Sequence, residues 1–347
     1  MKRDIPDIHD LAASKKVSLP RIMDFTTTVN PVGPSAKAKN AVRKSLKIID
    51  RHPDRNARYL LRSIARSEGV SEENIFLGES FETLTASILR AVDARMVLCA
   101  APYPAYYQGL PDGPAHMRFC PLDRAAGFSL DIEGWLREMK ECDAAILPCP
   151  SFLSAVPAPM ETVGRIVAQA GEKGTFLIID QTLREYSEIP SLSADITGHE
   201  RCLVVRSLSE YYALAGLPVS YAVGAPATLE NIRRRSSMGP PNTLAAAAAV
   251  ESLRDRTYRQ RTRSFMKRES SFIDNSLRGM RGVSFFTTVC GSFVITLDNS
   301  PSKPLETFRR YRIVIDSVGN AATLFFPVKD HKWNARYLKT LKNIMGA

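Results

Sequence analysis

The distribution of apolar and polar positions along the chain predicts an α/β protein. Short apolar runs predict buried strands at 97–99, 175–180, 203–205 and 289–297. Stretches with apolar residues at helical spacing lie between them, at 36–49, 55–67, 135–140 and 161–171. In the first of these, Ser35 is the predicted N-cap, and Val42, Leu46 and Ile49 share one face. The last third of the chain again alternates helix and strand, which predicts a second, smaller α/β unit.

Composition places the chain among ordinary globular proteins. Its 347 residues, 44% hydrophobic and 24% charged, suffice for one large and one small domain. We expect a cytoplasmic protein without membrane contact, because there is no apolar run of about 18 residues and the N-terminus lacks the apolar core of a signal peptide. The six cysteines are scattered and form no close pair, so buried free thiols are favoured over zinc ligands or disulfides.

The net charge of +11 comes largely from arginines in 233–235, 254–268 and 308–312. A basic face of this kind can meet nucleic acid or an acidic partner. No aromatic platform or nucleic-acid motif accompanies it, so the sequence favours solvated surface over nucleic-acid binding. A docking role for these arginines stays open.

The stretch 204–221, VVRSLSEYYALAGLPVSY, carries the most specific pattern. An apolar run ends in Arg206 and Ser207, and an Ala-Leu-Ala-Gly turn follows two tyrosines. This resembles the lysine segment of fold type I pyridoxal-phosphate (PLP) enzymes of the class I/II aminotransferase superfamily, above all histidinol-phosphate aminotransferases and threonine-phosphate decarboxylases. Glu210 stands where the family has the lysine that forms a Schiff base with PLP, and Pro218 where it has a phosphate-binding arginine.

The resemblance continues in order from 24 to 334. DFTTTVNPVGP at 24–34 resembles the family's opening strand, which places Asn30 on the substrate side. In RHPD at 51–54, His52 takes the position of a family tyrosine that reaches the cofactor phosphate of the neighbouring subunit. A lone histidine before proline is also consistent with an ordinary surface residue.

The loop that cradles the phosphate in this family corresponds to LGESFETL at 77–84. Ser80 takes a glycine position, and Glu79 and Glu82 take asparagine and threonine positions. Acidic residues would repel a phosphate. The alternative is that they simply cap the helix, because negative charge is favourable at a helix N-terminus. APYPAYYQ at 101–108 keeps Tyr107, whereas the ring that stacks on the cofactor falls at a proline unless a one-residue shift brings in Tyr103.

Asp180 is the one electronically important group of the cofactor site that the chain retains, whereas positions 152, 325 and 329 differ from the family. The resemblance implies that Asp180 pairs with the pyridinium nitrogen, while an acid at a strand end can equally cap the next turn. Phe152 replaces the asparagine that binds the phenolate oxygen. Phe325 replaces the arginine that binds the substrate carboxylate, and Lys329 falls at a later arginine.

The family resemblance implies a mixed, mostly parallel seven-stranded sheet sandwiched by helices, plus a smaller α/β domain built from both chain ends. The expected division is an N-terminal arm and part of the small domain at 1–50, a large domain at 51–240, and an interdomain helix with the rest of the small domain at 241–347. The family resemblance also implies a homodimer, and the alternative is a heterodimer with an active paralogue.

Three functional hypotheses follow. The first is a non-catalytic scaffold, regulatory or ligand-binding protein that forms no internal aldimine with PLP. The second is an enzyme that holds PLP or its aminated form PMP weakly and without a covalent bond, through Asp180, Ser207, Ser80 and Tyr107, with Glu210 as acid or base. The third uses a lysine from elsewhere, which needs an unusual loop because no lysine lies between Lys173 and Lys267. No cofactor is firmly predicted, because the changes shift the site toward negative charge, and two unit charges about 4 Å apart interact by roughly 4 kcal/mol at an effective dielectric of about 20.

Overall fold

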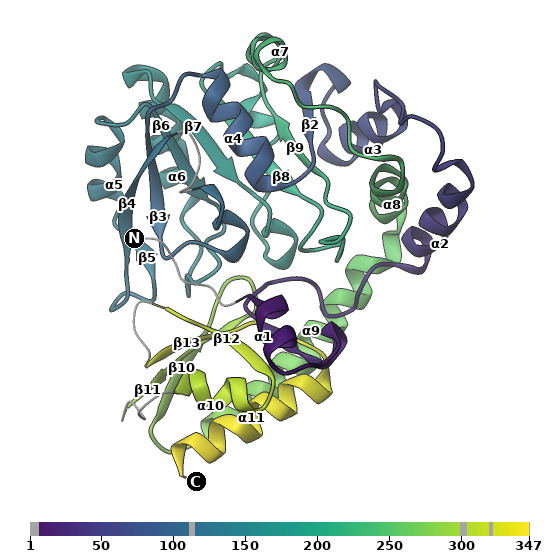
Figure 1. Cartoon of the computed structure of the whole chain (residues 1–347). Helices are drawn as coiled ribbons and strands as arrows, with labels where there is room; N and C mark the ends of the chain where they lie inside the picture. Colours follow the sequence, from purple (N-terminus) through teal and green to yellow (C-terminus); the bar gives the residue numbers. More distant parts are fainter. Residues whose placement is uncertain (1–6, 111–114, 299–303, 319–321, 347) are drawn as a thin grey trace.

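The computed structural model describes residues 7–110, 115–298, 304–318 and 322–346, and it contains two sheets (Figure 1). The large sheet has eight strands in the order β2 (Ile75–Gly78), β9 (Ser220–Val223), β8 (Cys202–Ser207), β7 (Phe176–Asp180), β6 (Ala144–Pro148), β3 (Met96–Ala101), β4 (His116–Asp123) and β5 (Ser129–Leu130). Strands β8, β7, β6, β3 and β4 are parallel, and the pairs with β9 and β5 are antiparallel. This confirms the mixed, mostly parallel sheet, with the two-residue β5 as a strand beyond the seven expected.

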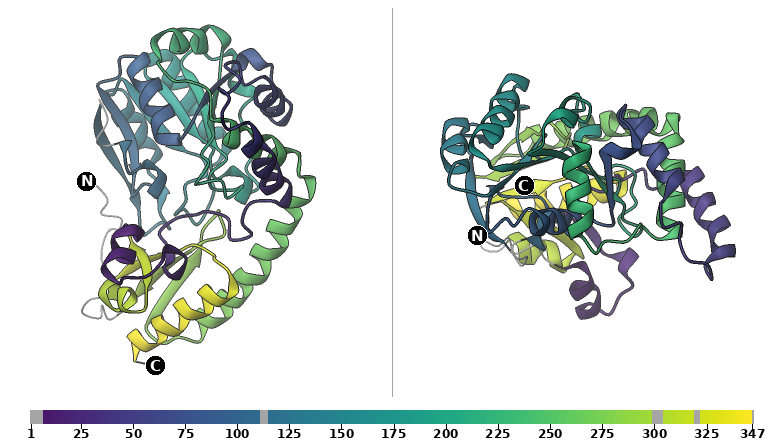
Figure 2. Two further views of the ribbon diagram at one scale, coloured as in Figure 1. Left: turned by 45° about the vertical axis from the view of Figure 1, so that its right-hand side comes forward. Right: turned by 90° about the horizontal axis from the view of Figure 1, so that it is seen from above.

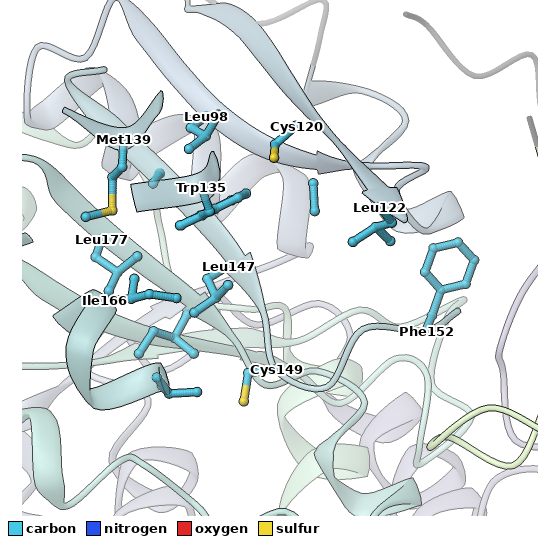
Figure 3. Close-up of a cluster of buried hydrophobic side chains, with 14 of the residues drawn as sticks. Leu98, Cys120, Leu122, Trp135, Met139, Leu147, Cys149, Phe152, Ile166 and Leu177 are labelled. Carbon is cyan, nitrogen blue, oxygen red and sulfur yellow. The ribbon is translucent and has the colours of Figure 1, made fainter. Parts of the chain in front are cut away.

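Helices cover both faces of the large sheet because its central strands are apolar on both sides. Leu177 and Ile179 of β7 belong to one buried cluster, with α5 (Ile132–Met139) and α6 (Met160–Lys173). Ile178 of the same strand belongs to the cluster on the opposite face, with α4 (Phe81–Ala91) and α7 (Pro226–Arg235). Figure 3 shows the first cluster, including Trp135 of α5 and, at its edge, Phe152.

The small sheet joins the two ends of the chain. Its order is β1 (Met23–Phe25), β12 (Ile313–Ser317), β13 (Thr323–Phe326), β11 (Phe293–Leu297) and β10 (Val283–Thr287), and β1 is parallel to β12. One face packs on α9 (Arg256–Arg278), α10 (Pro304–Arg310) and α11 (His331–Met345). Along β13, Leu324 and Phe326 point into this core, whereas Phe325 belongs to the cluster on the other face.

The remaining helices are α1 (Ile8–Ser14), α2 (Ala36–Ser45), α3 (Arg58–Glu68) and α8 (Thr243–Arg254). Helices α2 and α3 pack on α8, and α9 then runs along one side of the molecule toward the small sheet (Figure 2). Short 3-10 helices lie at Leu19–Arg21, Leu46–Ile48, Glu72–Asn74, Ala105–Tyr107, Arg184–Tyr186 and Asp195–Gly198.

Several element boundaries differ from the sequence prediction, and among them α3 begins at Arg58 rather than at 55 and α5 at Ile132 rather than at 135. Ser35 caps α2 as predicted, but the α-helix ends at Ser45 and continues only as a 3-10 turn to Ile48. The strand predicted at 289–297 begins at Phe293, because a turn with Gly291 at φ 74° precedes it. The six cysteines are buried free thiols, as their spacing predicts. Within the described ranges no helix combines the length and apolar character needed to cross a bilayer.

Candidate functional site

A cavity of about 450 Å³ lies where the strand ends of the large sheet face the segment that follows β1. Asp180 is the last residue of β7, and the loops after β3 and β8 carry Tyr106 and Glu210, so the three side chains meet because parallel strands end at the same edge of a sheet. Residues from both sheets line the space: Asp7, Ile8, Asp24, Thr26–Thr28, Ser80–Glu82, Pro104–Tyr106, Gln108, Phe152, Ser207, Ser209, Glu210, Ala215, Pro218 and Phe325.

Glu210 lies in the turn between β8 and β9, and its side chain is buried against the cavity. Thr28 Oγ1 donates a hydrogen bond of 2.6 Å to Glu210 Oε2. Among the described residues, Oε1 has no hydrogen-bond partner. Burial raises the pKa of Glu210, the hydrogen bond from Thr28 and the charge of Lys329 lower it, and the carboxylates of Asp24 and Asp180 raise it further. This position therefore presents a carboxylate to the cavity.

Asp180, at the end of β7, already has several hydrogen-bond donors from the protein. The hydroxyls of Tyr106 and Tyr107 each donate to Asp180 Oδ2 at 2.8 Å. The backbone N–H of Thr182 donates to Oδ1 at 2.8 Å, which is the turn-capping role that the sequence left open. Burial raises the pKa of Asp180, while these hydrogen bonds lower it.

Phe152 and Phe325 form an apolar wall of the cavity. Their ring centroids lie 5.2 Å apart in an edge-to-face arrangement, although the residues come from the loop after β6 and from β13 of the small sheet. This separation is typical of favourable aromatic pairs. The two positions at which the family resemblance implies polar groups are therefore in contact, and apolar side chains at both avoid burying an unpaired polar group.

The N-terminus of α4 forms another wall. Ser80 is the N-cap, and its hydroxyl accepts from the backbone N–H of Thr83 at 3.1 Å. In the first turn, Glu82 accepts a hydrogen bond of 2.7 Å from Gly109 N–H and so ties α4 to the loop after β3. Glu79 is exposed and does not line the cavity.

Asn30 connects the segment after β1 with the Glu210 turn. Its backbone N–H donates to Glu210 O at 2.9 Å, and its side-chain amide donates to Tyr211 O at 2.9 Å and Thr262 Oγ1 at 3.0 Å. Lys329 is buried behind the same segment and donates from Nζ to Thr27 O at 2.8 Å. Burial lowers the pKa of Lys329, and the charges of Asp24 and Glu210 raise it.

The structure brings together most of the predicted site residues, but not all of them. Glu210, Ser207, Ser80, Phe152 and Phe325 line the cavity, and Asp180 and Tyr107 lie beneath Tyr106. Of the remaining four, Asn30 and Lys329 are buried but do not line the cavity. His52 is exposed, and Tyr103 is buried and stacks on Tyr107 and Phe119 away from the cavity.

Sequence reasoning missed three residues that shape the site. Tyr106 supplies the aromatic side chain that lines the cavity over Asp180, and Asp24 of β1 and Thr28 of the segment after it line the cavity as well. Tyr106 could have been found from its place between two residues of the matched loop motif. Asp24 and Thr28 lie in the segment 24–34 that the sequence places on the substrate side, but their contacts with Glu210 depend on how the small sheet meets the large one.

Comparison with known proteins gives the family. The model for aminotransferase class I and II matches residues 25–321. Histidinol-phosphate aminotransferase 2 of Gluconobacter oxydans is 28% identical over 264 residues, which cover 73% of this chain and 71% of that protein. Threonine-phosphate decarboxylase of Salmonella typhimurium is 22% identical over 351 residues, which cover 98% and 95%.

Solved structures show the same fold. Histidinol-phosphate aminotransferase from Sinorhizobium meliloti, in complex with pyridoxal-5'-phosphate, superposes with a TM-score of 0.86 at 17% identity and covers 99% of this chain and 96% of its own. The enzyme from Clostridium acetobutylicum superposes with a TM-score of 0.83 at 21% identity and covers 94% and 99%. This chain therefore belongs to the class I and II aminotransferase family.

Proposed function

We propose that this protein is a member of its family that forms no internal aldimine and acts as a non-catalytic scaffold, regulatory or ligand-binding protein. The observation that carries the proposal is Glu210, whose carboxylate lines the cavity at the position where the segment 206–221 aligns with the family's lysine. A carboxylate cannot condense with an aldehyde. As a scaffold, the protein would pair with a second copy or with an active paralogue.

The other residues around the cavity fit PLP poorly. Tyr106 and Tyr107 already donate to the Asp180 oxygen that could meet a pyridinium nitrogen. Pro218 has no donor for a phosphate, and Phe152 has none for a phenolate. Glu82 adds a negative charge at the helix N-terminus where a phosphate would sit. We derive no reaction step through PLP from this arrangement.

One observation favours the second candidate, an enzyme of altered chemistry. Glu210 is a buried carboxylate with a raised pKa beside a cavity, and one of its oxygens accepts no hydrogen bond from the residues that the structure describes; these are properties of a general acid or base. Such an enzyme would hold PLP or PMP weakly and without a covalent bond, and it would respond to PMP more than to PLP.

The test is to add PLP or PMP to the purified protein and record the absorption spectrum, the melting temperature and, after borohydride reduction, the peptide masses. We expect no aldimine band, no reduced adduct and no stabilisation by PLP. A rise in melting temperature with PMP alone would favour the second candidate. A reduced adduct on any lysine, including the buried Lys329, would overturn the proposal.

Restoring the amine alone is a sharper test. Glu210→Lys should still fail to bind PLP at micromolar concentration, because Pro218 and Phe152 offer no hydrogen-bond donor to the cofactor. The Tyr106 hydroxyl also still donates to the Asp180 carboxylate. Glu79→Lys adds the same charge at an exposed position that does not line the cavity and serves as the matched control. Micromolar PLP binding by Glu210→Lys, but not by Glu79→Lys, would show that one substitution accounts for the loss.

A further inference from the structure

The charges around the cavity are unusual for a protein with a net charge of +11. Four lining residues are acidic, Asp7, Asp24, Glu82 and Glu210, and no lysine or arginine lines the cavity among the residues that the structure describes. Beneath it lie a further carboxylate, Asp180, and one ammonium group, Lys329. Carboxylates therefore outnumber cations around the cavity, although the molecule as a whole is basic.

Within this acidic cavity, Glu210 offers a specific hydrogen-bond acceptor. Its side chain is only 6% exposed, and Thr28 uses one oxygen. The second oxygen faces the cavity without a hydrogen-bond partner in the described part of the chain, although Glu82 and Asp180 each accept bonds from the protein. A bound N–H donor that reaches this oxygen from the cavity would form a charge-assisted hydrogen bond with it.

The other walls of the cavity are aromatic and suit the apolar part of a ligand. Phe152 and Phe325 pack edge to face, and the Tyr106 ring lines the cavity over Asp180. Aromatic faces attract cations as well as apolar groups. The volume of about 450 Å³ lies within the range of about 300–1,000 Å³ that is usual for small-molecule sites.

We propose that the cavity binds a small organic cation, whose primary ammonium group donates to Glu210 Oε1 and whose apolar or aromatic body packs on Phe152, Phe325 and Tyr106. This inference rests on the proposed function, because an aldehyde cofactor would fill the same space. The ligand carries no carboxylate, since Phe325 offers no charge to pair with one and the surrounding acids repel it.

A matched series of ligands tests the proposal by calorimetry on the full chain. Phenethylamine, phenethyl alcohol and phenylalanine share one aromatic body and differ in their charged groups. We expect phenethylamine to bind about 10- to 100-fold more tightly than the neutral alcohol, as for one charge-assisted hydrogen bond. Phenylalanine should bind more weakly than phenethylamine. Equal binding of amine and alcohol, or no binding of the amine, would overturn the inference.

Glu210→Gln should reduce phenethylamine affinity by about 10-fold or more, since the amide keeps the shape and loses the charge. Glu79→Gln, which removes a charge outside the cavity, should leave the affinity unchanged. Amine binding that persists in Glu210→Gln would contradict the assignment of Glu210. This failure is distinct from that of the proposed function, which would appear as a reducible adduct with PLP.

The pH dependence of the wild type provides a measurement that needs no variant. Groups that influence Glu210 come from several elements: Lys329 after β13, Asp24 on β1, Asp180 on β7, Tyr106 after β3 and Tyr186 after β7. Because the pKa of Glu210 lies above its ordinary value of 4.5, phenethylamine affinity should fall as the pH is lowered through that pKa. A flat profile would count against Glu210 as the acceptor.

Discussion

At the scale of single residues, Glu210 places a buried carboxylate on the cavity wall. A carboxylate there cannot form a Schiff base, and burial makes its ionisation unfavourable although Lys329 partly compensates. The sequence already locates this residue by its place in a family motif. Its partners, Thr28 and Asp24, come from the far end of the chain and are evident only in the folded molecule.

Glu210→Gln should stabilise the protein near neutral pH. A group whose pKa is raised by folding contributes stability that is complete below its unfolded pKa, near 4.5, and is lost as the pH rises through the folded pKa. The variant should therefore melt a few degrees higher than the wild type at about pH 8, and the difference should vanish at about pH 4. Melting curves across this range check the prediction. A larger gain at low pH would mean that the sign is wrong.

At the scale of elements, the segment after β1 holds the Glu210 turn in place. Asn30 donates from its backbone N–H to Glu210 and from its side chain to Tyr211 of the turn and Thr262 of α9, so one residue connects the N-terminal segment and α9 with the turn after β8. Tyr186 adds a hydrogen bond of 3.0 Å to Thr28 O. The sequence predicts Asn30 as a substrate-side residue, whereas its side-chain amide and backbone N–H are used within the protein.

Asn30→Ala should cost about 1–3 kcal/mol of unfolding free energy, because it removes the buried amide that donates to Tyr211 O and Thr262 Oγ1 and, among the residues that the structure describes, leaves Tyr211 O with only the 3.2 Å bond from the Tyr258 hydroxyl. It should also increase amide hydrogen exchange in 207–219, the turn that this residue holds. Asn40→Ala, at an exposed residue of α2 that bonds only to Arg43 in the described chain, is the control and should change neither quantity. If amide hydrogen exchange in 207–219 were unaltered in Asn30→Ala, Asn30 would not be what holds this turn in place.

At the scale of the whole molecule, exposed apolar residues gather around α2 and α3. Leu46 is 51% exposed, Ile49 67% and Tyr59 70%, and a groove lined by Ile48, Tyr59 and α8 residues lies beside them. Large exposed apolar side chains on one face favour association with another protein surface. This agrees with the homodimer that the family resemblance implies.

Ile49→Asp combined with Tyr59→Asp should therefore convert a dimer into a monomer without unfolding it, since both side chains are exposed in the single chain. Sedimentation velocity gives the mass, and circular dichroism the fold. Val156→Asp, at a residue that is 58% exposed in the loop after β6, is the control and should remain dimeric. A monomeric wild type would refute the homodimer, and a dimer that survives the double substitution would place its interface elsewhere.

The sequence by itself determined the fold class and the order of the segments, and it predicted which of the family's functional positions are replaced. These depend on local patterns: apolar runs for β7 and β8, a serine cap for α2, and a motif around Glu210. Such local patterns can be recognised in the sequence alone because they depend on neighbours along the chain.

Only the tertiary structure decided which side chains meet. Phe152 and Phe325 are far apart in sequence and pack together, Tyr106 rather than Tyr103 lines the cavity over Asp180, and the carboxylates converge on one space. Such contacts depend on how the small sheet is placed against the strand ends of the large one. The physical reason is that pairing, burial and charge act through space, and the packing of the two sheets brings these distant residues together.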